Sequence, residues 1–125
     1  VRQSDVLTTI NAHQADALFI SPPARNSFRS ADARIWMWEA WWHGNPYYNI
    51  EHAYRDSLFG QRSADEHGYA RAIASVFSSA QDYPVIILQT NEQRLHEFEP
   101  HMRNARPNVE IVAPHSNEVY LIGTK

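Results

Sequence analysis

Three residues that follow a short apolar run have the types and the spacing to hold a ligand. The run from Ala17 to Ile20 leads directly into Ser21, Pro22 and Pro23. Proline fixes its own φ and has no backbone N–H, so the carbonyls of this turn and the Ser21 hydroxyl are available to a group outside the strand. These three residues are the first candidate site. The alternative interpretation is an ordinary turn that ends a buried strand.

The elements around this turn can be placed from hydrophobic periodicity and from cap and turn residues. Helices are expected over 5–13, 30–43, 49–59 and 63–80, with a further helix opened by a Thr90/Gln93 capping box and kinked or restarted at Pro100. Continuous apolar runs predict strands at 17–21, 85–88, 109–112 and 119–122. A polar turn separates the last two runs, which favours an antiparallel hairpin.

This order of elements predicts an α/β fold. Strands separated by helices favour a parallel sheet with helices on both faces. We therefore expect a Rossmann-like three-layer sandwich, with a mostly parallel sheet of about four strands and a C-terminal antiparallel hairpin. The length of 125 residues predicts a single domain, 1–125.

In such a sheet, ligands bind at the carboxyl ends of the strands. Thr90 and Asn91 follow the 85–88 strand just as Ser21 follows the first strand, so both belong to the candidate site. Arg25 and Arg29 lie close to the Pro-Pro turn and are candidates for contacts with phosphate. Solvated surface arginines are the alternative for this pair.

The segment Ala17-Leu18-Phe19-Ile20-Ser21-Pro22-Pro23 resembles the catalytic motif of amino-methylating, S-adenosylmethionine-dependent methyltransferases of class I. The order of the elements that follow is similar to the C-terminal half of that fold. The resemblance implies that Ser21 and the Pro22 carbonyl accept hydrogen bonds from a target amine. It also implies a nucleotide or nucleic-acid substrate and S-adenosylmethionine as a possible cofactor.

The chain departs from this family in two ways. Position 24 is Ala, where the family has an aromatic residue that stacks on the substrate, so Phe28 would have to take that role. The chain has only 4 glycines, and none of them forms the Gly-rich loop of a cofactor site. A partner chain would then supply the cofactor half, or that half has been lost.

All 4 Trp residues lie in one aromatic block, 35–48. For Trp38, Trp41 and Trp42 the pattern favours a core or a subunit interface, because large aromatic side chains dominate both. Trp36 shares the polar stripe of the predicted helix and is the one expected to be exposed. Trp36 could stack on a base, and Tyr47 could line a cleft.

Composition excludes several classes of function. The formal net charge of −3 leaves no broad basic footprint, so contact with nucleic acid must be local. The chain has no Cys, which excludes thiol chemistry and fits a cytoplasmic location. The 7 His show no metal-ligand spacing, so no metal is expected. The apolar runs are too short to cross a membrane.

Two hypotheses for function follow. The first is a methyltransferase-like domain that acts on or binds a nucleotide or nucleic-acid substrate and needs a partner chain. The second is a non-catalytic module that uses the Trp-rich helix to bind a partner protein or a second copy of itself. A small nucleotide-processing enzyme of another Rossmann-like family is a third, less favoured hypothesis.

Overall fold

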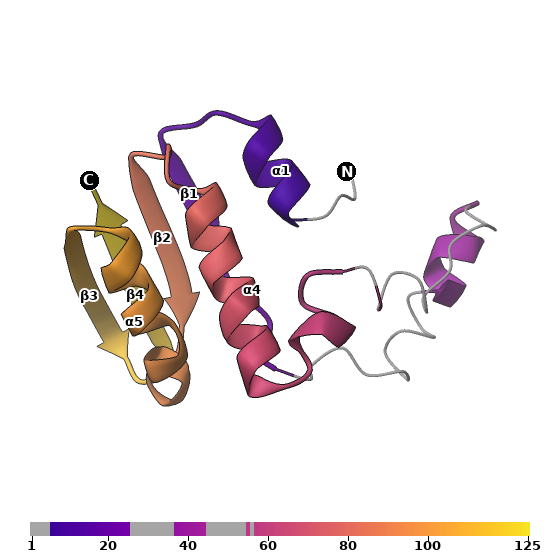
Figure 1. Cartoon of the computed structure of the whole chain (residues 1–125). Helices are drawn as coiled ribbons and strands as arrows, with labels where there is room; N and C mark the ends of the chain where they lie inside the picture. The colour runs from indigo at the N-terminus through magenta and orange to yellow at the C-terminus, as the bar shows by residue number, and fades with distance from the viewer. Residues whose placement is uncertain (1–5, 26–36, 45–54, 56) are drawn as a thin grey trace. The chain divides into compact units, whose positions relative to one another are not determined.

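The four predicted apolar runs form one four-stranded sheet (Figure 1). The computed structural model describes residues 6–25, 37–44, 55 and 57–125. The strands, in chain order, are β1 (Ala17–Ile20), β2 (Val85–Thr90), β3 (Asn108–His115) and β4 (Glu118–Thr124). Their order across the sheet is β1-β2-β4-β3. The predicted positions are therefore confirmed, with β2, β3 and β4 longer than expected.

The sheet is mixed in direction. β1 is parallel to β2, whereas β4 is antiparallel to both β2 and β3. Three strands therefore run in one direction and β4 runs in the other. The sequence predicted a shared sheet with a closing antiparallel pair, and both features are confirmed.

The described helices are α1 (Val6–Ala12), α4 (Glu66–Ser79) and α5 (Leu95–Ala105), with two short 3₁₀ helices, η1 (Gln61–Ser63) and η2 (Glu92–Arg94). Residues 37–42 are the described part of a further helix. No helix in these parts of the chain is long and apolar enough to cross a membrane. The chain divides into two compact units. The sheet-bearing unit is Val1–Pro22 with Ile73–Lys125, and the second unit is Pro23–Ala72.

Helix α4 begins at Glu66, later than the predicted start at Ser63, and the Asp65 side chain caps it. The Asp65 Oδ1 atom accepts a hydrogen bond from the Gly68 backbone N–H at 2.6 Å. A Cβ at position 68 would clash with the backbone carbonyl of Arg62. A glycine inside a helix is destabilising relative to alanine, but the close approach of the preceding turn requires one at this position.

The next helix also begins differently from the prediction. Thr90 is the last residue of β2, and the Asn91 side chain is the cap, accepting a hydrogen bond from the Arg94 N–H at 2.9 Å. Pro100 lies inside α5, which continues through it to Ala105 as one helix. The expected capping box at Thr90 is therefore wrong, because the strand extends two residues further than the apolar run.

One face of the sheet is buried beneath helices. Residues 73–79 of α4 and the whole of α5 lie on the same side of the strands (Figure 1). The core side chains come from both helices and from the two central strands: Ile73, Val76, Phe77, Ile86, Leu88, Phe98, Met102, Val119 and Leu121. The alternation of buried and half-buried residues along β2 and β4 shows that this face alone is fully enclosed by the described residues.

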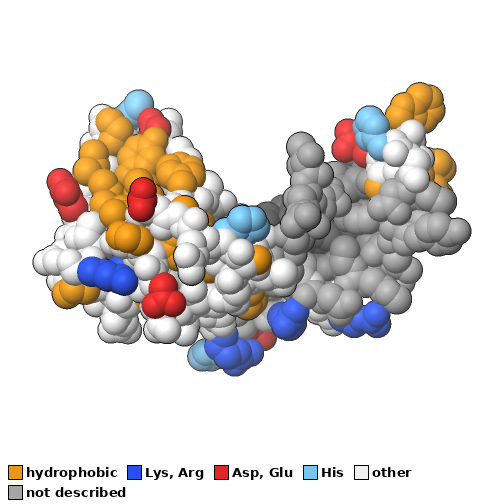
Figure 2. Space-filling model, turned by 90° about the horizontal axis from the view of Figure 1, so that it is seen from above, with side chains coloured by type: hydrophobic (Ala, Val, Ile, Leu, Met, Phe, Trp, Pro, Cys, Tyr) orange, Lys and Arg blue, Asp and Glu red, His pale blue; other side chains and the backbone are white. Residues whose placement is uncertain are grey.

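The opposite face of the sheet is half-exposed. Phe19 of β1 is 57% exposed, and its register partner Ile87 of β2 is half-buried. Figure 2 shows hydrophobic side chains gathered at the surface of the sheet-bearing unit, with acidic side chains beside them. The α/β class and the mixed sheet are thus established, while a third layer on this face remains a prediction.

Arg106 links the helical layer to the sheet. Its side chain is 3% exposed, and its Nη2 atom donates a hydrogen bond to the Ala80 carbonyl at 2.7 Å, just past the C-terminus of α4. The negative end of the helix dipole lies there and favours a cation. Burial lowers the pKa of the Arg106 guanidinium, and its Nε and Nη1 atoms have no partner among the described residues.

Gly123 makes room for this arrangement. A Cβ at position 123 would lie 2.8 Å from Cγ of Arg106 and would overlap the Met102 sulfur. Both contacts are in the buried layer between β4 and α5, so neither side chain can move into solvent.

We expect Gly123→Ala to lower the free energy of unfolding by about 1–3 kcal/mol, because the added methyl overpacks a filled site. Urea melts of the wild type and the variant measure the loss. Met102→Ala opens the space beside position 123, so Gly123→Ala should cost much less in that background. Equal costs in the two backgrounds would contradict the clash with Met102.

Candidate functional site

The carboxyl ends of β1 and β2 meet at one edge of the sheet, as predicted. Ile20 pairs with Leu88 in parallel register, so Ser21 leaves β1 at the level of Gln89. Ser21 is exposed and makes no hydrogen bond within the described part of the chain. Its hydroxyl is therefore available to a ligand at this edge.

The two faces of this edge differ. Gln89 pairs with Tyr120, and both are half-buried on the open face of the sheet. Thr90 pairs with Val119 on the helix-covered face, where Thr90 is 8% exposed and its Oγ1 atom has no partner among the described residues. Thr90 is therefore at the predicted edge but faces the buried layer.

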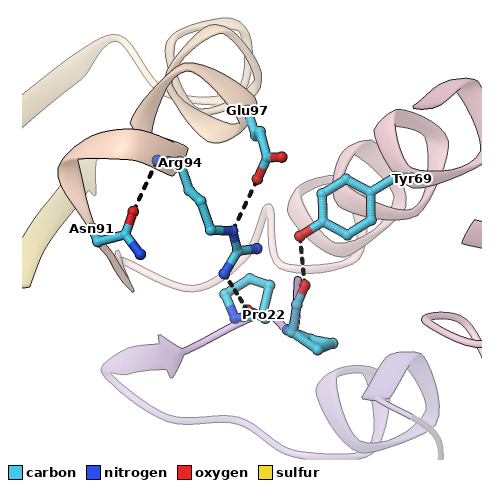
Figure 3. A network of polar contacts seen from close by, with 6 residues as sticks. Pro22, Tyr69, Asn91, Arg94 and Glu97 are labelled. Atoms are coloured by element: carbon cyan, nitrogen blue, oxygen red, sulfur yellow. Dashed lines mark hydrogen bonds and ion pairs between the residues drawn. The ribbon is translucent and has the colours of Figure 1, made fainter. Parts of the chain in front are cut away.

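In the sheet-bearing unit, the carbonyl of the first proline is held by Arg94 (Figure 3). The Arg94 Nη1 atom donates to the Pro22 oxygen at 3.4 Å, and Nε donates to Glu97 Oε2 at 3.1 Å. The guanidinium also lies over the Phe98 ring, 5.1 Å from its centroid. Pro22 itself is buried. The ion pair and the ring fix the arginine, so the turn is anchored to the start of α5.

In the second unit, the carbonyl of the next proline is also engaged. The Tyr69 hydroxyl donates to the Pro23 oxygen at 2.6 Å (Figure 3). The Tyr69 ring packs against Phe59, with ring centroids 6.0 Å apart. Each carbonyl of the turn thus has at least one donor from the protein. A carbonyl oxygen has two lone pairs, so the Pro22 oxygen can still accept a second hydrogen bond.

The other predicted site residues are placed only in part. Asn91 is half-buried at the same edge, and its side-chain oxygen caps the following helix. Arg25 is exposed, two residues beyond the turn. The remaining predicted contacts lie outside the described residues: Phe28, Arg29, Trp36 and Tyr47.

Sequence reasoning missed a polar cluster where β4 begins. The Tyr120 hydroxyl donates to Oε1 of Glu118, and the His115 Nε2 atom lies 3.2 Å from Oε2 of the same carboxylate. The hydrogen bond to Glu118 raises the pKa of the Tyr120 phenol, with burial and the carboxylate charge acting in the same direction. Since Tyr120 pairs with Gln89, this cluster borders the candidate edge.

The signal for this cluster is present in the sequence. Residues two apart on a strand share a face, which places Glu118 and Tyr120 together. In the structure, His115 and Glu118 flank a two-residue turn of the hairpin, and such flanking residues lie opposite each other. When residues 114–117 are considered only as a turn between two strands, the contact of His115 with Glu118 is not apparent.

A hollow lies at the opposite edge of the sheet, beside the amino ends of β1 and β2. Its volume is about 540 Å³, and it is lined by the end of α1 and by the segments that lead into the two strands. Tyr83 is one of its lining residues, and the Tyr83 hydroxyl donates to the carbonyls of Ile10 at 3.0 Å and His13 at 2.8 Å. It is not the predicted edge, and it contains none of the predicted site residues.

The Trp-rich helix is exposed in its described part, residues 37–42. Trp42 is 88% exposed, Trp38 65% and Trp41 42%. The rings of Trp38 and Trp41 meet edge to face, with centroids 5.5 Å apart. The interpretation of these three residues as core is therefore wrong, because the apolar circumference of this helix is not enclosed. The interface interpretation stays open.

Comparisons with known proteins do not assign the chain to a family. No protein-family model matches the chain, and neither the curated proteins nor the solved structures contain a match. Among the described residues there is also no group of three or more His, Asp or Glu side chains that could hold a metal ion.

The Glu118 cluster makes a prediction for tyrosine ionisation. Because the folded pKa of Tyr120 is raised, its phenol should stay protonated where an ordinary tyrosine, with a pKa of about 10, ionises. The associated stability is fully present below pH 10 and is lost as the pH rises through the raised pKa. Ultraviolet titration of the wild type minus Tyr120→Phe isolates this late component.

In a Glu118→Ala background, the same difference should return towards the ordinary midpoint. A Tyr120 midpoint at or below 10 in the intact chain would contradict the hydrogen bond to Glu118.

Proposed function

We propose that this chain is a methyltransferase-like domain that binds a nucleotide or nucleic-acid base at the carboxyl edge of β1 and β2. The observation that carries the proposal is the parallel register of Ile20 with Leu88, which puts the exposed Ser21 hydroxyl beside Gln89 at that edge. Ligands of parallel sheets bind at such an edge. The resemblance of the Ser21-Pro22-Pro23 turn to the amine-binding motif supports the same ligand class.

The turn is suited to hold an amine in a fixed direction. Arg94, anchored by Glu97 and Phe98, fixes the Pro22 carbonyl while leaving one of its lone pairs available. An exocyclic amine could then donate one hydrogen bond to Ser21 and one to Pro22. Such positioning lowers the entropy cost of reaction without any covalent role for the protein.

In this proposal, binding of the cofactor S-adenosylmethionine requires a partner chain. A Gly-rich loop that could cradle S-adenosylmethionine is not visible in the sequence. We therefore propose a partner chain as its source. Arg25, exposed near the turn, would contact a phosphate of the substrate.

Ser21→Ala should weaken the binding of a short oligonucleotide about two- to tenfold, the loss of one hydrogen bond. Calorimetric titration with oligonucleotides and with S-adenosylmethionine measures it, for the chain alone and with any co-purifying partner. The melting temperature should change little, since Ser21 is exposed and unbonded among the described residues. Ser78→Ala, at an exposed serine of α4, is the matched control.

Arg25→Ala should weaken the oligonucleotide complex more at low salt than at high salt, because charge contacts are least screened there. Absence of binding to either ligand in both preparations would reject this function.

A second function is favoured by a separate observation, the exposure of three Trp side chains on residues 37–42. Trp is enriched among the residues that dominate binding energy at protein interfaces. We propose, as the alternative, a module that binds a partner protein through Trp38, Trp41 and Trp42. The edge-to-face contact of Trp38 with Trp41 would pre-form part of that surface.

Trp42→Ala should weaken this complex by about 2 kcal/mol or more, roughly 30-fold in Kd. Stability of the chain should change by less than about 0.5 kcal/mol, because Trp42 is 88% exposed. Size-exclusion chromatography of the co-purified complex gives the first result, and urea melts give the second. Glu39→Ala, also exposed on this helix, is the control.

Acrylamide quenching provides an independent measurement. The Trp fluorescence of the free chain should be strongly quenched and that of the complex protected. A complex that forms equally well with Trp42→Ala, and with unprotected fluorescence, would exclude the Trp surface as its interface.

A further inference from the structure

The two edge strands of the sheet differ in how they are protected. β3 carries the exposed Glu110 and Pro114, and its pairing with β4 is irregular between Val112 and His115. A charge, a proline and a bulge are the devices by which proteins prevent an edge strand from pairing with another chain. This edge is therefore built to remain unpaired.

β1, at the other edge, is only four residues long, which itself limits pairing, but it carries no charge, proline or bulge. It reads Ala-Leu-Phe-Ile, a continuous apolar run of the kind found in strands that are covered on both faces. It is nevertheless the last strand in the order β1-β2-β4-β3, and no described residue pairs with its outer side. Its Phe19 side chain is 57% exposed.

We propose that the outer side of β1 pairs with β1 of a second copy of this chain, joining two sheets into one across a twofold axis. Such an axis, perpendicular to the sheet, makes the two copies of β1 antiparallel and keeps each face of the sheet on its own side. Residues opposite each other must then belong to the same face. The interface goes beyond both proposed functions and depends on neither.

The sequence of β1 selects one register. If Phe19 lies opposite Phe19 of the second copy, Leu18 lies opposite Ile20 on the covered face. Every large side chain of the strand then has an apolar partner, and an aromatic pair forms on the open face. A register centred on Leu18 would instead place Ile20 opposite Asp16 and Phe19 opposite Ala17. Because β1 is self-complementary in the register centred on Phe19, a second copy of this chain is the partner that fits its outer side.

A single cysteine tests both the pairing and its register. The natural chain has no Cys, so Phe19→Cys introduces the only thiol. Directly opposed residues of antiparallel strands have Cβ atoms about 4.5–5.5 Å apart, near the range that a disulfide spans. Under mild oxidation we expect disulfide-linked dimers at least tenfold faster from Phe19→Cys than from Val112→Cys. Val112 is also exposed but lies on the protected edge.

Sedimentation velocity provides the test without a cross-link. The wild type should form dimers as its concentration rises, and Phe19→Lys should remain monomeric at the same concentrations. Val112→Lys should associate like the wild type. Circular dichroism of each variant checks that the chain is folded, and both positions are exposed, so both substitutions should be tolerated.

Three outcomes would overturn the proposal. The first is equal cross-linking rates for the two cysteine variants. The second is a wild-type chain that stays monomeric at all concentrations. The third is a dimer that is abolished by Trp42→Ala and unaffected by Phe19→Lys, which would assign association to the Trp surface. Persistence of the Phe19→Cys cross-link in a Trp42→Ala background would show that the β1 interface is independent of that surface.

Discussion

The buried guanidinium of Arg106 is the interaction on which the sheet-bearing unit depends. It joins three elements: it follows α5, donates to the carbonyl just past α4, and lies over β4 at Gly123. An arginine that is 3% exposed is stable only where its charge is compensated. Here the end of a helix supplies compensation through the Nη2 hydrogen bond, and a residue without a side chain supplies the space. The α4, α5 and β4 elements are therefore fixed relative to one another.

From this fixed layer, the position of the candidate edge follows. α5 begins one turn after β2 ends, so its first residues lie where the strands terminate. Arg94, at the end of η2, reaches the Pro22 carbonyl from there. The Pro-Pro turn is thus anchored at the start of α5, and Arg106 follows the end of the same helix. A ligand at Ser21 would meet a rigid turn.

The sequence predicted the features whose cause is local. Apolar runs bounded by prolines or polar turn residues indicated the four strands, and the polar segment 114–117 indicated their final pairing. Features with a nonlocal cause were not predicted, such as the contact of Arg94 with Pro22, which are far apart in the chain.

The core assignment of the Trp helix failed because composition indicates an apolar surface but not what encloses it. The sequence indicated the edge of the sheet at which the candidate residues lie, but not the face of the sheet on which each side chain lies. Thr90 faces the buried layer because β2 extends through it, which the apolar run alone did not indicate.

The order of pairing in the sheet also bears on how the chain folds. β3 and β4 are joined by a two-residue turn, so their pairing closes a small loop at little entropic cost. β1 and β2 are separated in the chain by the entire second unit, and a parallel contact of such sequence separation forms slowly. From these separations we expect the hairpin to form first, β2 to pair with β4 next, and β1 to join last. Until that final step the inner side of β1 is as unpaired as its outer side, and its apolar run is the segment of this chain most in need of protection during synthesis.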